Sequence, residues 1–361
     1  MKKVLFIVTN LDSGGIENYL LRFLKNYNGF ILPSVLCKDG KLGALESEYR
    51  QIKNIDIIPF KIGFFDITAL YRLKKRMEVE KYDTVVDFGG NFAGLTLWMA
   101  SLANIKNRIA FYRGSANHFN ETFFKLKYND FVKNMVLKHA TSILSNSKAA
   151  LNFFFKGVND SRFEIIYNGI DSEKFLITKE DLRNELQIPD NAFVVSHVGR
   201  YTKEKNHQTV LNTAFILCEK HEDIYFILCG KGVDTELKQQ VLERKLEKRI
   251  LLLPFRRDII KVLNSSDVFF FPSYTEGQPN ALIEALIVGL AFVASDIDPI
   301  KETIPIEYYD FLIPPNDTMA AVKKIELLYK DKELKRDFNL SKWAIKNYQS
   351  DILFKQFFNK L

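Results

Sequence analysis

Two glutamates, Glu276 and Glu284, stand eight positions apart in a segment that follows an apolar run and opens a helix. Gly277, Asn280 and Ala281 lie between them. Carboxylates accept hydrogen bonds from hydroxyl groups and repel phosphate, so this pair favours a ligand rich in hydroxyls, such as a sugar or a ribose. The free N–H groups of the first helical turn can receive a phosphate of the same ligand. The segment therefore predicts a site for a phosphorylated, polyhydroxylated molecule.

Countercharge for such a phosphate is provided by the segment from Gly199 to Asn206, which directly follows another apolar run. Gly199 lets the backbone turn closely, Arg200 offers a planar fork of donors, and Lys205 adds a mobile point charge. In the transfer of a sugar from a nucleoside diphosphate, negative charge builds on the departing diphosphate. Two cations placed beside it would stabilise the transition state more than the ground state.

The elements that must position these residues are short β-branched or aromatic runs alternating with helical segments. Several of the runs are apolar on both faces, as strands buried between two helix layers are, and the alternation predicts parallel sheets built from βαβ units. Twelve strands are expected, in two consecutive sets: Val4–Val8, Val35–Cys37, Asp56–Pro59, Thr84–Phe88, Arg108–Tyr112 and Ser142–Ser145, then Phe193–Val198, Tyr225–Cys229, Ile250–Pro254, Val268–Pro272, Phe292–Ser295 and Phe311–Pro314. The expected fold class is α/β, with two doubly wound Rossmann-like domains.

The domain boundary is expected at the Asn168-Gly169 pair, which marks a turn before a polar, charged segment. We assign residues 1–170 to a first domain and 171–340 to a second one. Residues 341–361 form an amphipathic pattern, predicted to be a single helix that buries side chains including Ile352 and Phe357.

Composition limits the function classes. The 361 residues are 47% hydrophobic and 26% charged, which is typical of a folded soluble chain. The three cysteines form no CxxC pair and are expected to be buried thiols, and the five histidines show no zinc-ligand spacing. The N-terminal apolar run is too short for a signal peptide, and no run approaches the ~18 residues of a membrane span. We therefore expect a cytoplasmic protein.

Positive charge is concentrated in the first half. Residues 1–170 carry 24 basic and 15 acidic side chains, whereas residues 171–361 carry 27 and 29. Within the first half, the segment 111–138 interleaves aromatic and basic residues. This pattern is compatible with a peripheral contact on the inner face of an anionic membrane, or with an amphipathic helix whose aromatic residues enter the core. A nucleic-acid partner is not expected, because it would leave the two glutamates unexplained.

With these motifs the sequence resembles the retaining glycosyltransferases of family 4, which have the GT-B fold. Glu276 and Glu284 match the E-x7-E motif within the Glu-Gly-x-Pro-Asn-x-Leu-Ile-Glu-Ala pattern, and Arg200 and Lys205 match the Gly-Arg…Lys element. The segment from Gly14 to Glu17 is similar to the Gly-Gly-x-Glu loop of that family. The resemblance covers nearly the whole chain and is strongest over residues 163–300.

The resemblance implies a nucleotide-sugar donor, with a UDP-sugar favoured, held by the second domain, and a glycan or lipid-linked acceptor held by the first. It implies that Arg200 and Lys205 bind the diphosphate, Glu284 the ribose and Glu276 the donor sugar. It also implies that Gly14 and Gly15 let the backbone approach the donor. No metal or other cofactor is expected, and the helix 341–361 would pack back on the first domain.

Two segments depart from the family pattern. Many relatives place a histidine after the strand that corresponds to Arg108–Tyr112, where this chain has Arg113-Gly114; His118 is the nearest candidate for a catalytic role. The sequence Asp296-Ile297-Asp298 replaces the expected glycines and spells a metal-binding D-x-D motif of another fold, which we interpret as a coincidence. Two alternative functions remain at this stage: a non-catalytic sugar-nucleotide-binding subunit and a GT-B-fold sugar-nucleotide epimerase.

Overall fold

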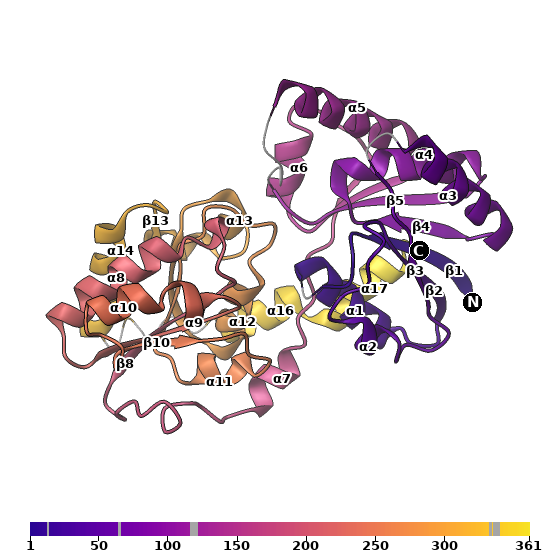
Figure 1. Ribbon diagram of the computed structural model, residues 1–361. Helices are drawn as coiled ribbons and strands as arrows, with labels where there is room; N and C mark the ends of the chain where they lie inside the picture. The colour runs from indigo at the N-terminus through magenta and orange to yellow at the C-terminus, as the bar shows by residue number, and fades with distance from the viewer. Residues whose placement is uncertain (13, 64–65, 116–121, 332–333, 335–339) are drawn as a thin grey trace. The chain divides into compact units, whose positions relative to one another are not determined.

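The computed structural model describes residues 1–12, 14–63, 66–115, 122–331, 334 and 340–361. The chain forms two compact units, one of residues 1–169 with 351–361, and one of residues 170–350 (Figure 1). Each unit contains a parallel sheet. Cys37, Cys218 and Cys229 are buried free thiols, as the sequence predicts.

The first unit has a seven-stranded parallel sheet in the order β3-β2-β1-β4-β5-β6-β7. Its strands are β1 (Lys2–Val8), β2 (Ile31–Cys37), β3 (Asp56–Pro59), β4 (Thr84–Asp87), β5 (Asn107–Tyr112), β6 (Ser142–Ser145) and β7 (Phe163–Ile165). Its helices are α1 (Gly15–Asn26), α2 (Glu46–Tyr49), α3 (Ile67–Glu80), η1 (Gly90–Ala93), α4 (Gly94–Leu102), α5 (Phe123–His139), α6 (Lys148–Phe154) and most of α17 (Ser350–Phe358).

Successive residues of β1 enter opposite core layers, because side chains alternate along a strand. Val4, Phe6 and Val8 pack with residues of α1 and α17, whereas Leu5 and Ile7 pack with residues of α3 and α4. A sheet covered on both faces in this way explains why its central strands are apolar throughout rather than alternating with polar residues.

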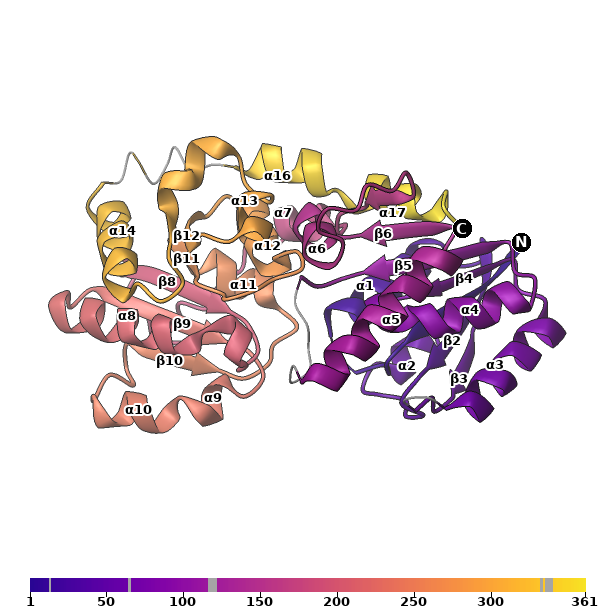
Figure 2. The same cartoon turned by 90° about the horizontal axis from the view of Figure 1, so that it is seen from above.

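The second unit has a six-stranded parallel sheet in the order β10-β9-β8-β11-β12-β13. Its strands are β8 (Phe193–Val198), β9 (Ile224–Cys229), β10 (Ile250–Leu253), β11 (Val268–Phe271), β12 (Ala291–Ser295) and β13 (Leu312–Ile313). Its helices are α7 (Ser172–Ile177), η2 (Lys203–Lys205), α8 (His207–Lys220), α9 (Val233–Glu236), α10 (Lys238–Glu243), α11 (Ile259–Asn264), α12 (Asn280–Val288), α13 (Asp298–Lys301), η3 (Ile306–Phe311), α14 (Thr318–Lys330) and α16 (Ser341–Tyr348). Helices α8 and α14 pack together, and α12 packs against α7, α11 and α16 on the other side of the sheet (Figure 2).

The C-terminal segment differs from the predicted single helix. Gln349 is extended and separates α16 from α17. Helix α16 stays with the second unit, because the hydroxyl groups of Ser341 and Tyr348 donate to the carbonyls of Ile287 and Thr303. Only residues 351–361 join the first unit. Within α17 the expectation for Ile352 was wrong, since its side chain is 52% exposed and Leu353 is buried instead.

Candidate functional site

The two loops that carry the predicted donor-binding residues meet at one edge of the second sheet. Strands β8 and β11 are neighbours at the centre of that sheet, and the chain leaves them toward opposite sides, to β9 and to β12. The carboxyl ends of two such strands form the crevice in which doubly wound sheets bind ligands. Residues 199–206 follow β8 and residues 272–279 follow β11, so both segments lie at this crevice.

Lys205 and Glu276 contact each other across the two loops. The Lys205 Nζ atom lies 2.6 Å from Glu276 Oε1 and 4.8 Å from the centre of the Phe271 ring. The two charged side chains are only 24% and 9% exposed, so water screens this ion pair less than it screens a pair on an open surface. The structure thus joins two of the four residues that the sequence assigns to the donor.

Backbone hydrogen bonds hold the two loops together. The N–H of Tyr274 donates to the carbonyl of Glu204 at 2.8 Å. Asn206 adopts a left-handed conformation with φ of 53° and caps α8. Its side-chain amide donates to the carbonyls of Pro272 and Pro315 at 2.9 and 2.8 Å. A single buried side chain therefore connects the ends of three strands, a role that the sequence analysis did not assign to Asn206.

Arg200 is exposed, and within the described part of the chain it forms no ion pair. Glu284 lies one turn inside α12 and is partly exposed, as are Asn280 and Ala281 at the start of that helix and Gly277 in the loop before it. The first turn of α12 follows the loop that carries Glu276, so its N–H groups lie on the same side of the sheet as the ion pair.

Two histidines underlie the loop after β8. The Nδ1 atom of His197 lies 2.9 Å from the carbonyl oxygen of Phe270, so Nδ1 carries the proton. The rings of His197 and His207 meet edge to face at 4.8 Å. Burial lowers the pKa of His207 to about 4 and lowers that of His197 well below its ordinary value. Both rings are therefore neutral near pH 7, and the positive charge of this loop comes from its lysine and arginine side chains.

Gly230 allows the loop after β8 to pack on the loop after β9. A Cβ atom on Gly230, which follows β9, would lie 1.9 Å from the carbonyl oxygen of Gly199. The N–H of Tyr201 donates to the carbonyl of Lys231 at 2.9 Å. The loop after β9, which contains Gly230, therefore packs directly against the loop after β8, which contains Arg200. Arg256, which follows β10, forms ion pairs with Asp258 and Glu185.

In the first unit, Gly14 and Gly15 follow β1 and begin α1. A Cβ atom on Gly14 would lie 2.3 Å from the Glu17 carboxylate, whereas one on Gly15 would meet no atom within 4 Å. Gly15 also has no positive φ, so neither packing nor backbone conformation requires a glycine there. His118 lies outside the described residues. Gly14 and Gly15 belong to the first unit, whereas Arg200, Lys205, Glu276 and Glu284 belong to the second.

A polar cluster around Asp87, at the carboxyl edge of the first sheet, was not predicted from the sequence. Asp87 ends β4 fully buried and accepts hydrogen bonds from the N–H of Gly89, from the Thr96 hydroxyl and from Lys38 Nζ, the last at 2.8 Å. Lys38 and Thr96 also line a pocket of about 150 Å³ with Tyr128. The signal that could have revealed the cluster is a charged residue at the end of an otherwise apolar strand.

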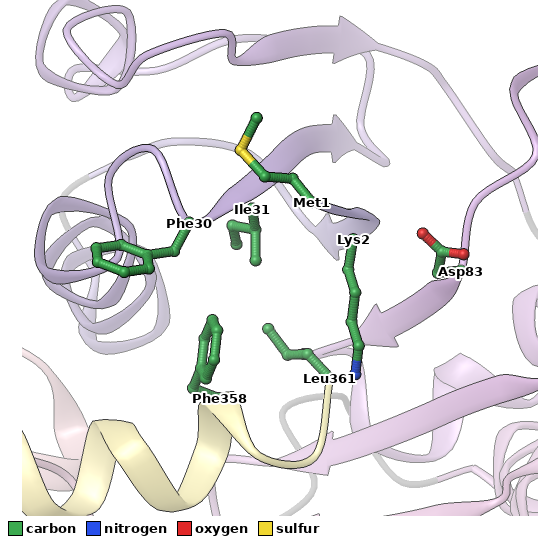
Figure 3. Close-up of a pocket in the computed structure, with 7 residues that line it drawn as sticks. All are labelled: Met1, Lys2, Phe30, Ile31, Asp83, Phe358 and Leu361. Carbon is green, nitrogen blue, oxygen red and sulfur yellow. The ribbon is translucent and has the colours of Figure 1, made fainter.

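A larger pocket, of about 490 Å³, lies at the opposite edge of the same sheet. Its lining includes Met1, Phe30, Phe358 and Leu361, at the start of β1 and β2 and at the end of α17 (Figure 3). This edge carries the amino ends of the strands, away from the loops that position the candidate residues. Cavity volume alone therefore does not identify the functional site.

Asp296 and Asp298, the acidic residues of the D-x-D sequence, lie between the end of β12 and the first turn of α13. Asp296 forms an ion pair with Lys301 at 2.5 Å. Among the described residues, His, Cys, Asp and Glu side chains form no cluster of three or more that could hold a metal ion.

Comparison with known proteins places this arrangement in a class. The whole chain is similar to the crystal structure of HepE from Anabaena in complex with UDP-glucose, with a TM-score of 0.82, 21% identity and coverage of 99% and 98% of the two chains. It is also similar to WaaG, described as a glycosyltransferase involved in lipopolysaccharide biosynthesis, with a TM-score of 0.76. Two Rossmann-like domains of this kind define the GT-B fold.

Sequence comparison gives the family. The profile described as Glycosyl transferases group 1 matches residues 178–342, and the profile described as Glycosyltransferase Family 4 matches residues 13–174. A relative from Escherichia coli, UDP-Gal:alpha-D-GlcNAc-diphosphoundecaprenol alpha-1,3-galactosyltransferase, is 31% identical over 74% of this chain and 72% of its own length. The capsular polysaccharide biosynthesis glycosyltransferase CapH from Staphylococcus aureus is 26% identical over 90% and 91%. The chain therefore belongs to the family 4 glycosyltransferases and is an enzyme of the transferase class, which confirms the expected family and fold.

Proposed function

We propose that this enzyme transfers a hexose or an N-acetylhexosamine from a UDP-sugar to a lipid-linked or glycan acceptor during synthesis of a cell-surface polysaccharide. The observation that carries the proposal is the Lys205–Glu276 pair at the crevice between β8 and β11. The names of the E. coli and S. aureus relatives support the donor class, the acceptor class and the pathway.

In the proposed reaction the bond between the anomeric carbon and the diphosphate breaks, and a bond to an acceptor hydroxyl oxygen forms. The acceptor loses its proton, and UDP leaves with the bonding electron pair. Arg200 and Lys205 stabilise the negative charge that builds on the diphosphate oxygens. Glu276 orients the donor sugar through its hydroxyls, and Glu284 holds the ribose. The anomeric configuration is retained.

The Lys205–Glu276 contact would place the group that binds the diphosphate beside the group that binds the donor sugar. Since the lysine is already held beside the glutamate, the cation for the diphosphate and the acceptor for sugar hydroxyls stand next to each other before the donor arrives. Side chains fixed in this way need little reorganisation during the reaction, which is the basis of electrostatic preorganisation. Reaction without a metal ion is part of the proposal, with the two cations in the place of a divalent ion.

The test is a panel of nucleotide sugars incubated with the purified enzyme, with and without an extract of membrane lipid, while release of UDP is followed. Lipid-dependent release of UDP, unchanged by a chelator, is the expected outcome, and NMR of the product gives the anomeric configuration. Binding without release would instead indicate a non-catalytic subunit. Interconversion of the sugar without release would indicate an epimerase. Loss of release in the chelator would contradict metal independence.

A further inference from the structure

Arg113 directly follows β5 in the first unit and has donors that the fold does not use. Its Nε and Nη1 atoms are buried, and neither has a hydrogen-bond partner among the described residues. Arg113 also forms no ion pair with any residue that the structure describes. Buried donors without an acceptor cost free energy. The two N–H groups therefore point to an oxygen that the protein itself does not provide.

Two aromatic rings hold the guanidinium group of Arg113 in place. Its central carbon, Cζ, lies 3.7 Å from the centre of the Tyr19 ring and 4.9 Å from that of the Phe111 ring, and both rings are fully buried. Contacts with ring faces use the flat side of the cation and leave the N–H groups in its plane for hydrogen bonds. Burial lowers the pKa of Arg113 to about 10, so the side chain is still charged near pH 7. The residue is partly exposed, so a ligand can reach it.

Arg113 lies where a doubly wound sheet binds ligands. Tyr19 belongs to α1, which follows β1, whereas Arg113 follows β5, and β4 lies between these two strands in the sheet. The chain leaves β1 toward β2 on one side, and β4 continues to β5 on the other. The carboxyl ends of β1 and β4 therefore form the crevice of this sheet. The contact between Arg113 and Tyr19 borders that crevice within the first unit.

Asn146 adds a second polar group without a partner at the same edge. It follows β6, which lies beside β5 (Figure 2). The N–H of Asn146 donates to the carbonyl of Tyr112 at 3.1 Å, and Tyr112 pairs with Ser145, so Asn146 and Arg113 are the next positions along the two strands. Asn146 is only 2% exposed, yet its Oδ1 atom has no hydrogen-bond partner in the described part of the chain. A donor from outside the protein would satisfy this oxygen.

We propose that Arg113 and Asn146 form a subsite that binds a sugar phosphate. The planar fork of Arg113 donates to phosphate oxygens, which it matches in geometry. The amide oxygen of Asn146 accepts from a sugar hydroxyl, since an ionised phosphate has no proton to donate. The inference rests on the proposed function and deepens it. Because Arg200 and Lys205 are proposed to hold the diphosphate of the donor, we assign this sugar phosphate to the phosphorylated end of the acceptor.

The first test is binding of N-acetylglucosamine 1-phosphate to the full chain, measured by isothermal titration calorimetry. N-Acetylglucosamine, glucuronate and UDP are the comparison ligands. We expect the sugar phosphate to bind about tenfold or more tightly than the neutral sugar, because a hydrogen bond to a charged group is lost with the phosphate. The phosphate should also bind more tightly than glucuronate.

Substitutions assign this binding to the subsite. Arg113→Gln should weaken binding of the sugar phosphate about tenfold or more, and Arg113→Lys should weaken it less, because lysine keeps the charge and loses only the planar fork. Asn146→Asp should also weaken it, since a carboxylate repels phosphate. Binding of UDP should stay unchanged in all three variants. Arg50→Gln, which replaces an exposed arginine at the end of α2 in the same unit, is the matched control and should bind as the wild type does.

Kinetics separate a contact with the acceptor from a structural role. In the UDP-release assay, Arg113→Gln should raise the amount of lipid extract needed for half-maximal rate by about tenfold, with KM for the donor unchanged. Circular dichroism and thermal unfolding show whether each variant is folded. If Arg113→Gln does not fold, Arg113→Lys and Asn146→Asp provide the same comparison.

Wild-type binding of the sugar phosphate by the folded variants would overturn the proposal, and so would equal affinity of the wild type for the phosphorylated and the neutral sugar. Tighter binding of glucuronate would assign the subsite to a carboxylate instead. Weaker binding of UDP alone in Arg113→Gln would assign Arg113 to the donor. An enzyme that releases UDP without binding the sugar phosphate would contradict this inference alone, whereas binding without any UDP release would contradict only the proposed function.

Discussion

Lys205 and Glu276 form an ion pair between two loops that are remote in sequence. Their 2.6 Å contact is partly buried, so removing one partner takes the opposite charge of this pair away from a side chain that water screens poorly. In the proposed reaction the glutamate would therefore act on the donor in two ways: through hydroxyl contacts of its own, and by fixing the lysine proposed to meet the diphosphate.

For Lys205→Ala we expect turnover to fall by about 100-fold, the usual loss when one transition-state electrostatic contact is removed. Lys203→Ala removes an exposed lysine from the same short helix η2 and is the matched control, with turnover close to that of the wild type. Steady-state kinetics of UDP release measures both. Wild-type turnover in Lys205→Ala would rule out our assignment of the diphosphate site.

Glu284→Ala should act differently, because ribose contacts are the same in the ground state and the transition state. We expect KM for the donor to rise about tenfold with kcat nearly unchanged, the pattern of lost uniform binding. Glu307→Ala, at an exposed position of the same unit, serves as the control. A fall in kcat with unchanged KM would move Glu284 from donor binding to the chemical step.

The neutral histidines predict a pH dependence of stability. Burial lowers the pKa of His207 to about 4, whereas the unfolded chain has a value near 6.5, so the unfolded state binds the extra proton between these limits. The unfolding free energy should therefore fall as pH drops from 6.5 to 4, by about 3 kcal/mol from this residue alone. His207→Gln cannot take up that proton. Denaturant unfolding should show a shallower pH slope for His207→Gln over this range, and an identical slope would contradict the prediction.

At the scale of elements, the strands were largely predictable from sequence and their ends were not. Asp56–Pro59, Ser142–Ser145 and Phe193–Val198 agree with the predicted bounds, because each contains apolar residues, including β-branched ones, between segments with a helical pattern. The short edge strand β7 (Phe163–Ile165) was missed, since all three of its residues are only partly buried and give no such run.

The site was predictable in its residue types but not in its contacts. The sequence indicated that Glu276 and Lys205 follow different strands, yet nothing in it required that they bind each other. The role of Asn206 was also hidden, because it depends on carbonyl groups of residues 272 and 315, which only the sheet order brings near. The break at Gln349 lacks the proline or glycine that usually marks the end of a helix, so the sequence predicted a single helix.

Gly230 and Gly15 differ in the effect that an alanine substitution should have on stability. Gly230→Ala should destabilise the second unit, because its new Cβ would lie 1.9 Å from a backbone oxygen and the loop carrying Arg200 would have to shift. Gly15→Ala meets no atom within 4 Å and should keep the wild-type melting temperature, while lowering turnover if the donor approaches that backbone. Differential scanning calorimetry together with UDP release measures both. Wild-type turnover in Gly15→Ala would assign that glycine to the turn alone.

For the whole molecule, the C-terminal helix belongs to the core of the first unit although the second unit precedes it in the chain. Phe354 and Phe357 are buried among the aromatic rings of the first unit, and the Phe357 ring centre lies 4.7 Å from that of Phe23. The carbonyl of Leu361 accepts a hydrogen bond from the buried Thr84 hydroxyl at 2.7 Å. Eleven residues at the end of the chain thus complete a core formed mainly by the first 169.

Phe357→Ala should lower the unfolding free energy of the first unit by about 3–5 kcal/mol, as for other buried phenylalanines. Ile352→Ala, on the exposed side of the same helix, should change it by less than about 0.5 kcal/mol. Urea unfolding followed by probes in each unit gives the two transitions. The prediction fails if the transition of the second unit moves as far as that of the first.

The late position of α17 has a consequence for how the protein is made. On the ribosome, the first 169 residues and then the second unit are synthesised before residues 351–361 of α17 and the C-terminus. Until then the nascent first unit exposes Tyr19, Phe23 and Phe111 on the face that α17 will cover. Such an exposed aromatic surface is a binding site for chaperones and a risk for aggregation. The first unit therefore reaches its final fold only after translation of the second is complete.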